Sequence, residues 1–87
     1  MNMKKCTYVA ILTQDLECGG YCITFPDFKG CITEGDDIAD AYYMAHDALE
    51  LHLTGMLEDG DEIPSPTDLK DIELDKGQYT MVVQVEI

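Results

Sequence analysis

The sequence contains no arginine, and its basic side chains are five lysines and two histidines. Against these stand eighteen aspartates and glutamates, which give a formal net charge of −13 at pH 7. Neutralisation of backbone phosphates by Lys and Arg supplies most of a protein's affinity for nucleic acid. The composition therefore argues against direct nucleic-acid binding by this chain alone. A basic protein partner fits the charge, because opposite fields steer association; acidity that serves solubility alone is the alternative.

Long apolar runs are also missing. No window approaches the roughly 20 apolar residues of a membrane span, and the apolar run 8–12 is too short for the core of a signal peptide. The four cysteines form no Cys-x-x-Cys pair, and no histidine stands at zinc-finger spacing, so we expect no metal and no cofactor. We expect reduced thiols in the cytoplasm, with Cys22 and Cys31 packed on strands and Cys18 exposed.

The chain is short enough to predict a single domain over residues 1–87. A domain of this size buries only about 60–65% of its unfolded surface, so its core is thin and an oligomer or a partner would help to hold it. The apolar fraction of 46% suits a globular fold and argues against disorder. The sequence has no internal repeat and no low-complexity tract.

The first half of the chain predicts a β-hairpin. Residues 7–13 are apolar on both faces, which is typical of a central strand. A turn over residues 14–20 follows, in which Gly19 and Gly20 can adopt the positive φ of a tight hairpin. Residues 21–25 then return antiparallel, with large apolar and small polar side chains in alternation.

Two further strands are expected. Pro26 lacks an N–H group and ends the second strand, residues 27–30 form a corner, and residues 30–34 supply a short third strand. Residues 79–87 alternate again between apolar and polar side chains and predict the last strand.

A helix is predicted between the third and fourth strands. Asp37 can cap its first turn, Asp40 favours its positive N-terminus, and Gly60 ends it. Apolar residues recur at three- and four-residue spacing and project onto one stripe. These residues are Ile38, Ala41, Tyr42, Ala45, Ala48, Leu49, Leu53 and Met56. The small alanines let the helix lie close to a sheet.

The segment after the helix is an extended connector. Residues 62–68 are stiffened by Pro64 and Pro66. Residues 69–74 have no clear period and are either a loop or a short helical turn. A turn over residues 75–77 leads into the last strand.

The element order β-β-β-α-β predicts a small α+β domain of two layers. A three-stranded meander, a central first strand and a helical crossover give the sheet order 3-2-1-4, with the helix on one face and the fourth strand parallel to the first. The fourth strand is then a long edge that favours self-pairing into a homodimer or a higher oligomer. We expect that contact to involve Tyr79, Met81, Val83, Val85 and Ile87.

The ordered set of motifs resembles the HicB-like antitoxin family. A Gly-Gly-Tyr strand, a Phe-Pro-Asp corner and a Gly-Cys strand leading to a capped helix follow one another within residues 19–36. The helix end over residues 47–53, the Leu-Glu-Asp-Gly of residues 57–60 and the Ile-Pro-x-Pro of residues 63–66 extend the match. Each element is common by itself, whereas the order is specific. Many relatives have proline where this chain has Lys29.

The resemblance implies a partial ribonuclease-H-like fold that binds and silences a HicA-type toxin. Such toxins are small, basic, RNA-cleaving proteins with an essential histidine, and the antitoxin covers that site. Many relatives also carry a helix-turn-helix or ribbon-helix-helix module that binds the operator. We expect no separate C-terminal DNA-binding domain in this chain, which puts operator binding in doubt.

Other constellations favour structural roles over catalysis. A two-metal nuclease needs several carboxylates that converge on the ions, whereas the acids here fall mostly in turns and on the outer helix face. We therefore do not expect an enzyme. His46 and His52 lack an accompanying nucleophile and are interpreted as packing or capping residues. Tyr43, on the polar helix face, is either an interface residue or an isolated surface tyrosine.

For the toxin contact we expect an acidic rim near the hairpin and the corner, in which the acids gather at the ends of the sheet and of the helix. Together with Tyr43, the predicted binding residues are Asp15, Glu17, Asp27, Glu34, Asp36 and Asp37. This choice follows from electrostatics and not from the family. The leading hypothesis is a toxin-binding antitoxin, and the alternative is an orphan HicB-like regulatory or dimerisation domain without a toxin.

Overall fold

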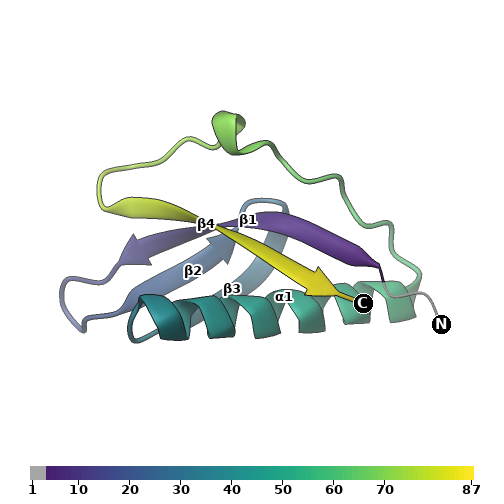
Figure 1. Cartoon of the computed structure of the whole chain (residues 1–87), viewed down its shortest axis with the longest axis horizontal. Coiled ribbons are helices and arrows are strands. Elements are labelled where there is room, and N and C mark those ends of the chain that lie inside the picture. The colour runs from purple at the N-terminus through teal and green to yellow at the C-terminus, as the bar shows by residue number, and fades with distance from the viewer. Residues whose placement is uncertain (1–3) are drawn as a thin grey trace.

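A computed structural model describes residues 4–87. Along the chain, the elements are β1 (Lys5–Gln14), β2 (Tyr21–Phe25), β3 (Phe28–Gly35), α1 (Ile38–Asp59), the 3-10 turn η1 (Leu69–Asp71) and β4 (Gln78–Glu86). The predicted order β-β-β-α-β is therefore confirmed, and the unassigned segment 69–74 contains a short helical turn. Figure 1 shows the helix under the sheet and the connector between α1 and β4 above it.

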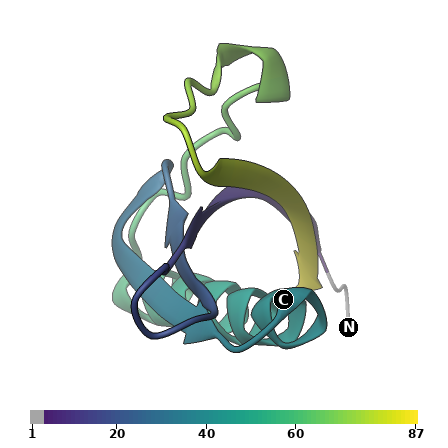
Figure 2. The same cartoon turned by 90° about the vertical axis from the view of Figure 1, so that its left-hand side faces the viewer.

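The four strands form one sheet in the order β3-β2-β1-β4, as the sequence predicted. The sheet curves around α1, and the connector lies on its other side (Figure 2). β1 is central and apolar on both faces. Its residues Tyr8, Ala10 and Leu12 lie in the main core, while Val9, on the side of the connector, is also buried. The α+β class and the single covering helix are confirmed.

The predicted direction of the last strand is wrong. β4 runs antiparallel to β1, with Lys5 opposite Glu86 and Thr13 opposite Gln78. The connector explains the difference, because it leaves the end of α1 and runs back along the sheet before β4 begins (Figure 1). The chain thereby reverses once more than a direct helical crossover would allow, and the handedness rule for parallel crossovers does not apply.

The helix packs through a narrower ridge than its periodicity predicted. Its fully buried residues are Ala41, Ala45, Leu49 and Leu53. Two residues of the predicted stripe, Ile38 and Tyr42, are instead 53% and 40% exposed. The stripe extends beyond the area that the sheet covers, so periodicity alone overestimates the core. Alanine at the first two ridge positions brings the helix backbone close to the strands.

The predicted helix ends are confirmed. The backbone N–H of Asp40 donates to the Asp37 carboxylate over 2.8 Å, and the Asp40 carboxylate accepts from the N–H of Asp36 over 2.9 Å. These two bonds satisfy donors that would otherwise be unpaired at the start of the helix. At the other end Gly60 takes the left-handed conformation with φ of 74°.

The close approach of helix and sheet depends on a glycine at the end of β3. A Cβ atom at Gly35 would lie 2.4 Å from the Cα atom of Ala41. Any side chain at position 35 would therefore push α1 away from the sheet. Gly35 is paired with Tyr21 on β2, so the hairpin, the end of β3 and the start of α1 form one compact end of the domain.

Two details of the strands differ from expectation. β3 begins at Phe28 and not at residue 30, because Phe28 pairs with Phe25 across a turn of only Pro26 and Asp27. A register shift between Thr24 and Phe25 accommodates that tight corner. Cys31 is buried as predicted, whereas Cys22 is exposed, because it lies on the outer face of β2.

Candidate partner-binding surface

The β1–β2 hairpin is organised by its own aspartate. The backbone N–H groups of Glu17 and Cys18 both donate to Asp15 Oδ1 over 3.0 Å. The bonds from Cys18 and Glu17 favour the ionised carboxylate and hold the pKa of Asp15 below its usual value. Gly19 and Gly20 complete the turn with φ of 77° and 78°, as predicted. Asp15 therefore stays charged while it shapes the loop.

A shallow depression of about 270 Å³ lies where this hairpin meets the end of β3 and the start of α1. Its lining residues are Asp15, Cys18, Gly19, Tyr21, Cys22, Glu34, Gly35 and Asp36. Three of the predicted partner-binding acids, Asp15, Glu34 and Asp36, are therefore brought together here from two separate segments. Glu17 in the hairpin and Asp37 beside Asp36 extend the same end of the molecule. We call these five acids the acidic end: Asp15, Glu17, Glu34, Asp36 and Asp37.

The acids of the acidic end fall into two groups. Asp15 and Asp37 accept backbone hydrogen bonds and therefore also hold the local structure. The side chains of Glu17, Glu34 and Asp36 make no hydrogen bond or ion pair within residues 4–87, and all three residues are exposed. These three carboxylates are free to contact a partner without loss of an internal bond.

Asp27 does not join the acidic end, so the expectation that all six acids gather in one rim is wrong. It lies in the corner between β2 and β3, at the opposite end of these strands from the hairpin. Its two carboxylate oxygens accept from the backbone N–H and the hydroxyl of Thr67, over 3.0 and 2.6 Å. Asp27 thus binds the connector to the sheet. Forty residues separate the two partners in sequence, and no local pattern reveals the contact.

A second contact fixes the same stretch of the connector. The hydroxyl of Tyr8, whose ring is buried, donates to the carbonyl oxygen of Pro64. Burial raises the pKa of Tyr8, and the nearby Cys6 and Asp27 add to that effect. The phenol therefore remains a donor throughout the physiological range. With the Asp27–Thr67 bonds it forms what we call the connector clamp: Tyr8, Asp27, Pro64 and Thr67.

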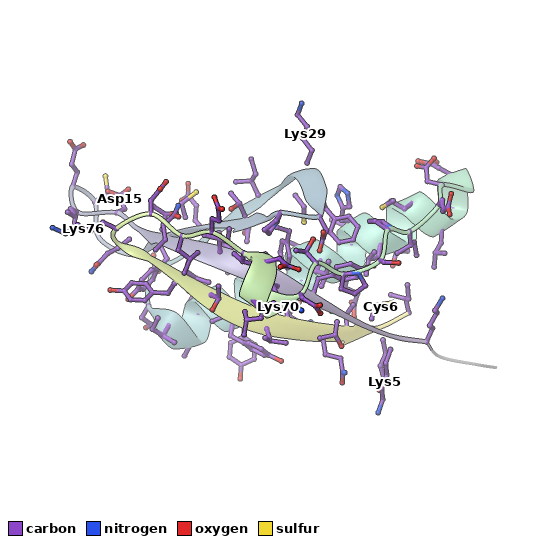
Figure 3. The ribbon with its side chains drawn as sticks, turned by 90° about the horizontal axis from the view of Figure 1, so that it is seen from above. Lys5, Cys6, Asp15, Lys29, Lys70 and Lys76 are labelled. Carbon is purple, nitrogen blue, oxygen red and sulfur yellow. The ribbon has the colours of Figure 1, made fainter. Side chains whose placement is uncertain are left out.

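The negative charge is not compensated internally. Within the described chain no lysine forms an ion pair, and the contact of this kind that is present joins His46 Nδ1 to the neighbouring Asp47 over 3.8 Å. Figure 3 shows Lys5 and Lys29 directed away from the body of the domain. Lys76 lies at the same end as Asp15, yet it too makes no ion pair (Figure 3). The carboxylates consequently present a largely unscreened negative field to any partner.

The remaining predicted residues occupy varied positions. Tyr43 is 68% exposed near the start of α1, with its ring 6.1 Å from that of Tyr42. His52 packs edge-on against Phe28 at a centroid distance of 5.3 Å, which confirms it as a packing residue. Between residues 4 and 87, no three His, Cys, Asp or Glu side chains converge in a way that could hold a metal ion.

The side chains predicted for self-association are partly used inside the monomer. Val83 and Val85 of β4 are fully buried under α1, and Met81 and Ile87 are half-buried. Tyr79 is 53% exposed. Self-pairing at β4, which stays a prediction, would therefore rely mainly on its backbone and on its outer side chains.

Comparison with known proteins matches two curated relatives. A protein from the rep-hol intergenic region of Haemophilus phage HP1 is 42% identical over 45 residues, which is 52% of this chain and 34% of that protein. Antitoxin HicB 1 of Photorhabdus laumondii is 38% identical over 56 residues, or 64% of this chain and 36% of the antitoxin. The chain thus spans about a third of the length of the relatives that it matches.

Solved structures share the fold. A chain of a toxin–antitoxin complex from Streptococcus pneumoniae superposes with a TM-score of 0.85 over 93% of this chain and 69% of that one, at 22% identity. The N-terminal domain of Burkholderia pseudomallei antitoxin HicB gives 0.77 over 94% of this chain and all of that domain, at 19% identity. A chain of a HicA3 and HicB3 toxin–antitoxin complex is 26% identical, with a TM-score of 0.67 over 90% and 95% of the two chains.

The match to a known family covers nearly the whole chain. No helix among the described residues is long and apolar enough to cross a membrane. Residues 8–87 match the family described as HicB_like antitoxin of bacterial toxin-antitoxin system. The matched range contains the hairpin, the corner, α1, the connector and β4. This chain therefore belongs to the HicB-like antitoxin family.

Proposed function

We propose that this chain is the antitoxin of a type II toxin–antitoxin pair, in which it binds a basic HicA-type RNA-cleaving toxin in the cytoplasm and inhibits it by covering the active site. Membership of the HicB-like antitoxin family supports the role, and two structural relatives are described as toxin–antitoxin complexes. A family of antitoxins also favours a binding role over an enzymatic one.

The charge of the acidic end is the observation that carries the proposed mode of binding. A protein that cleaves RNA must present cationic groups to the phosphates of its substrate. Glu17, Glu34 and Asp36 offer free carboxylates at one end of a domain with a net charge of −13. These carboxylates can pair with the same cationic groups and exclude RNA. Exposed Tyr43, on the first turns of α1, adds an aromatic contact.

The test begins with the protein encoded by the adjacent gene, co-expressed with this chain. We expect the two proteins to co-purify, the toxin alone to stop growth, and the pair to restore it. The triple variant Glu17→Lys, Glu34→Lys and Asp36→Lys should slow association strongly and weaken inhibition. These positions are chosen because none of their side chains holds the fold, whereas Asp15, Asp27 and Asp37 each do.

A matched control changes the same charge elsewhere. Asp68, Asp71 and Glu73 of the connector are exposed and their side chains make no hydrogen bond or ion pair within residues 4–87. Their reversal to Lys alters the net charge equally and should leave inhibition nearly intact. Equal losses in both triples would remove the acidic end from the proposal. Failure to bind any basic neighbour would favour an orphan regulatory domain instead.

A further inference from the structure

The two edges of the sheet differ in how well they are protected. β3 begins at a tight corner with a register shift, and it carries Lys29 and then Gly30 at φ of 91°. Charge, irregularity and kinks of this kind obstruct pairing with another strand. β4 has nine regularly paired residues, no proline and no lysine. β4 therefore lacks the features by which natural proteins protect an edge strand from pairing.

The hydrogen-bond ladder identifies which backbone groups of β4 are free. Lys4 and Ile87 exchange two backbone bonds of 2.7 and 2.9 Å, so the odd-numbered residues of β4 direct their N–H and C=O groups toward β1. The even-numbered residues direct theirs away from the sheet. The outward groups beyond the turn that precedes β4 belong to Thr80, Val82, Gln84 and Glu86.

We infer that this edge pairs with β4 of a second copy of the chain, in antiparallel register about a two-fold axis at Val82. Val82 is the middle residue of β4, so this register uses the full length of the strand. It places Thr80 opposite Gln84 of the second copy, and Gln78 opposite Glu86. Val82, which is 53% exposed on the outer face, meets its own equivalent.

Charge allows a second copy at this edge, whereas it opposes a second copy at the acidic end. Two molecules with a net charge of −13 repel each other, and contact costs least where carboxylates are absent. β4 contains one charged residue, Glu86, which lies at its end. Opposite Glu86 the register places Gln78, so no like charges are directly paired. A cationic partner would find more carboxylates at the acidic end and is a weaker fit here.

The first test is the oligomeric state of the full chain by sedimentation velocity at increasing concentration. We expect a dimer that becomes tighter with added salt, because salt screens the repulsion between the two copies. Toxin binding through the acidic end should weaken with salt, so the two associations are distinguished by opposite trends. A monomer at all concentrations and salt levels overturns the inference.

Val82→Lys tests the register. It places two like charges directly opposite each other and should weaken the dimer by about tenfold or more. Ile32→Lys is the matched control, because Ile32 is an exposed β-branched residue on the outer face of the other edge strand and gains the same charge. It should leave the dimer intact. Val82→Lys mixed with Val82→Glu should recover the dimer, and a failure of either expectation overturns the register.

Amide hydrogen exchange tests the same edge without mutation. As the concentration rises and the dimer forms, the N–H groups of Thr80 and Gln84 should exchange more slowly. The outward N–H groups of Ile32 and Glu34 on β3 should keep exchanging fast. The N–H of Val83, bonded to β1, is slow throughout. Protection of Thr80 and Gln84 only after addition of a toxin would overturn self-pairing and assign the edge to that partner.

Discussion

The two ends of the domain are closed by different means. At the hairpin end the backbone of β3 touches the start of α1, because Gly35 leaves no side chain between them. At the corner end the connector is held by side chains, through Asp27 to Thr67 and through Tyr8 to Pro64. The first end needs no carboxylate for its closure, and its outer acids remain available. At the second end the carboxylate of Asp27 is occupied by its hydrogen bonds to Thr67.

The difference shows that an aspartate in a turn can either hold the fold together or keep its carboxylate free for a partner. Asp36 and Asp27 both follow a strand and both lie among turn residues. Asp36 has a free side chain, whereas Asp27 accepts two hydrogen bonds from a residue forty positions away. The return path of the connector decides between the two roles. Loss of the Asp27 carboxylate should therefore lower stability, whereas loss of the free Asp36 carboxylate should act mainly on partner binding.

The largest effect should come from Gly35→Ala, which breaks the hairpin end. The added Cβ would lie 2.4 Å from the Cα and 2.6 Å from the N atom of Ala41, and backbone cannot yield as a side-chain tip can. We expect the free energy of unfolding to fall by about 3 kcal/mol, measured by urea denaturation.

Gly55→Ala is the control for that variant. Gly55 lies within α1, and a Cβ there would meet no atom within 4 Å. Alanine should therefore raise the free energy of unfolding by about 1 kcal/mol through helix propensity. Equal effects of the two substitutions would contradict the close contact at Gly35.

Asp27→Ala breaks the corner end. It leaves the half-buried N–H and hydroxyl of Thr67 without their acceptor and should lower the free energy of unfolding by about 2 kcal/mol. Glu34→Ala, at the acidic end, should change it by less than about 0.5 kcal/mol, because the Glu34 side chain bonds to nothing among residues 4–87. Toxin binding should show the reverse order, with Glu34→Ala weakening it more than Asp27→Ala. An Asp27→Ala variant as stable as the wild type would show that the clamp does not hold the connector.

Asp37→Ala removes the helix cap. It tests whether the acidic end contains both structural and free carboxylates. The substitution should lower the free energy of unfolding by about 1 kcal/mol, because the N–H of Asp40 loses its acceptor. Asp37→Asn keeps an acceptor oxygen at the cap and should recover most of the loss. Thermal unfolding followed by circular dichroism measures both. If asparagine performed no better than alanine, the cap would have to act through its charge alone.

Local chemistry predicted much of this arrangement. The glycines of the hairpin, the aspartate cap and the terminal Gly60 act within a few residues, and each has the predicted role. The order of the strands followed from the two apolar faces of β1. The alternation of β4 correctly grouped Val83 and Val85 on one face of the strand, but both were predicted for self-association and are instead buried in the core.

What the sequence did not reveal depends on contacts between distant segments. The direction of β4 is set by the length and path of the connector, which has no periodicity of its own. The same path brings Thr67 to Asp27. Ile38 and Tyr42 are exposed because the sheet ends before the apolar stripe does, and Cys22 is exposed because its face of β2 is left uncovered. The periodicity of apolar residues identifies one face of a helix or strand, but it does not show which other segment covers that face.

The smallest expected effect concerns the charge of Asp15, which shapes the hairpin without closing it. Its folded-state pKa lies below the ordinary value of 3.8, because the N–H groups of Cys18 and Glu17 bind the carboxylate. A depressed pKa stabilises the folded state above pH 3.8, and this contribution is lost as the pH falls through the folded-state value. Asp15→Asn keeps an acceptor oxygen but loses the charge. Its deficit in stability should therefore be present at neutral pH and disappear in acid, as followed by urea denaturation across the pH range. Glu17→Gln removes the same charge from the same hairpin without touching a hydrogen bond, and it should show no such deficit. If the two variants behaved alike, the preference for an ionised Asp15 would come from the general field of the hairpin and not from the two backbone donors.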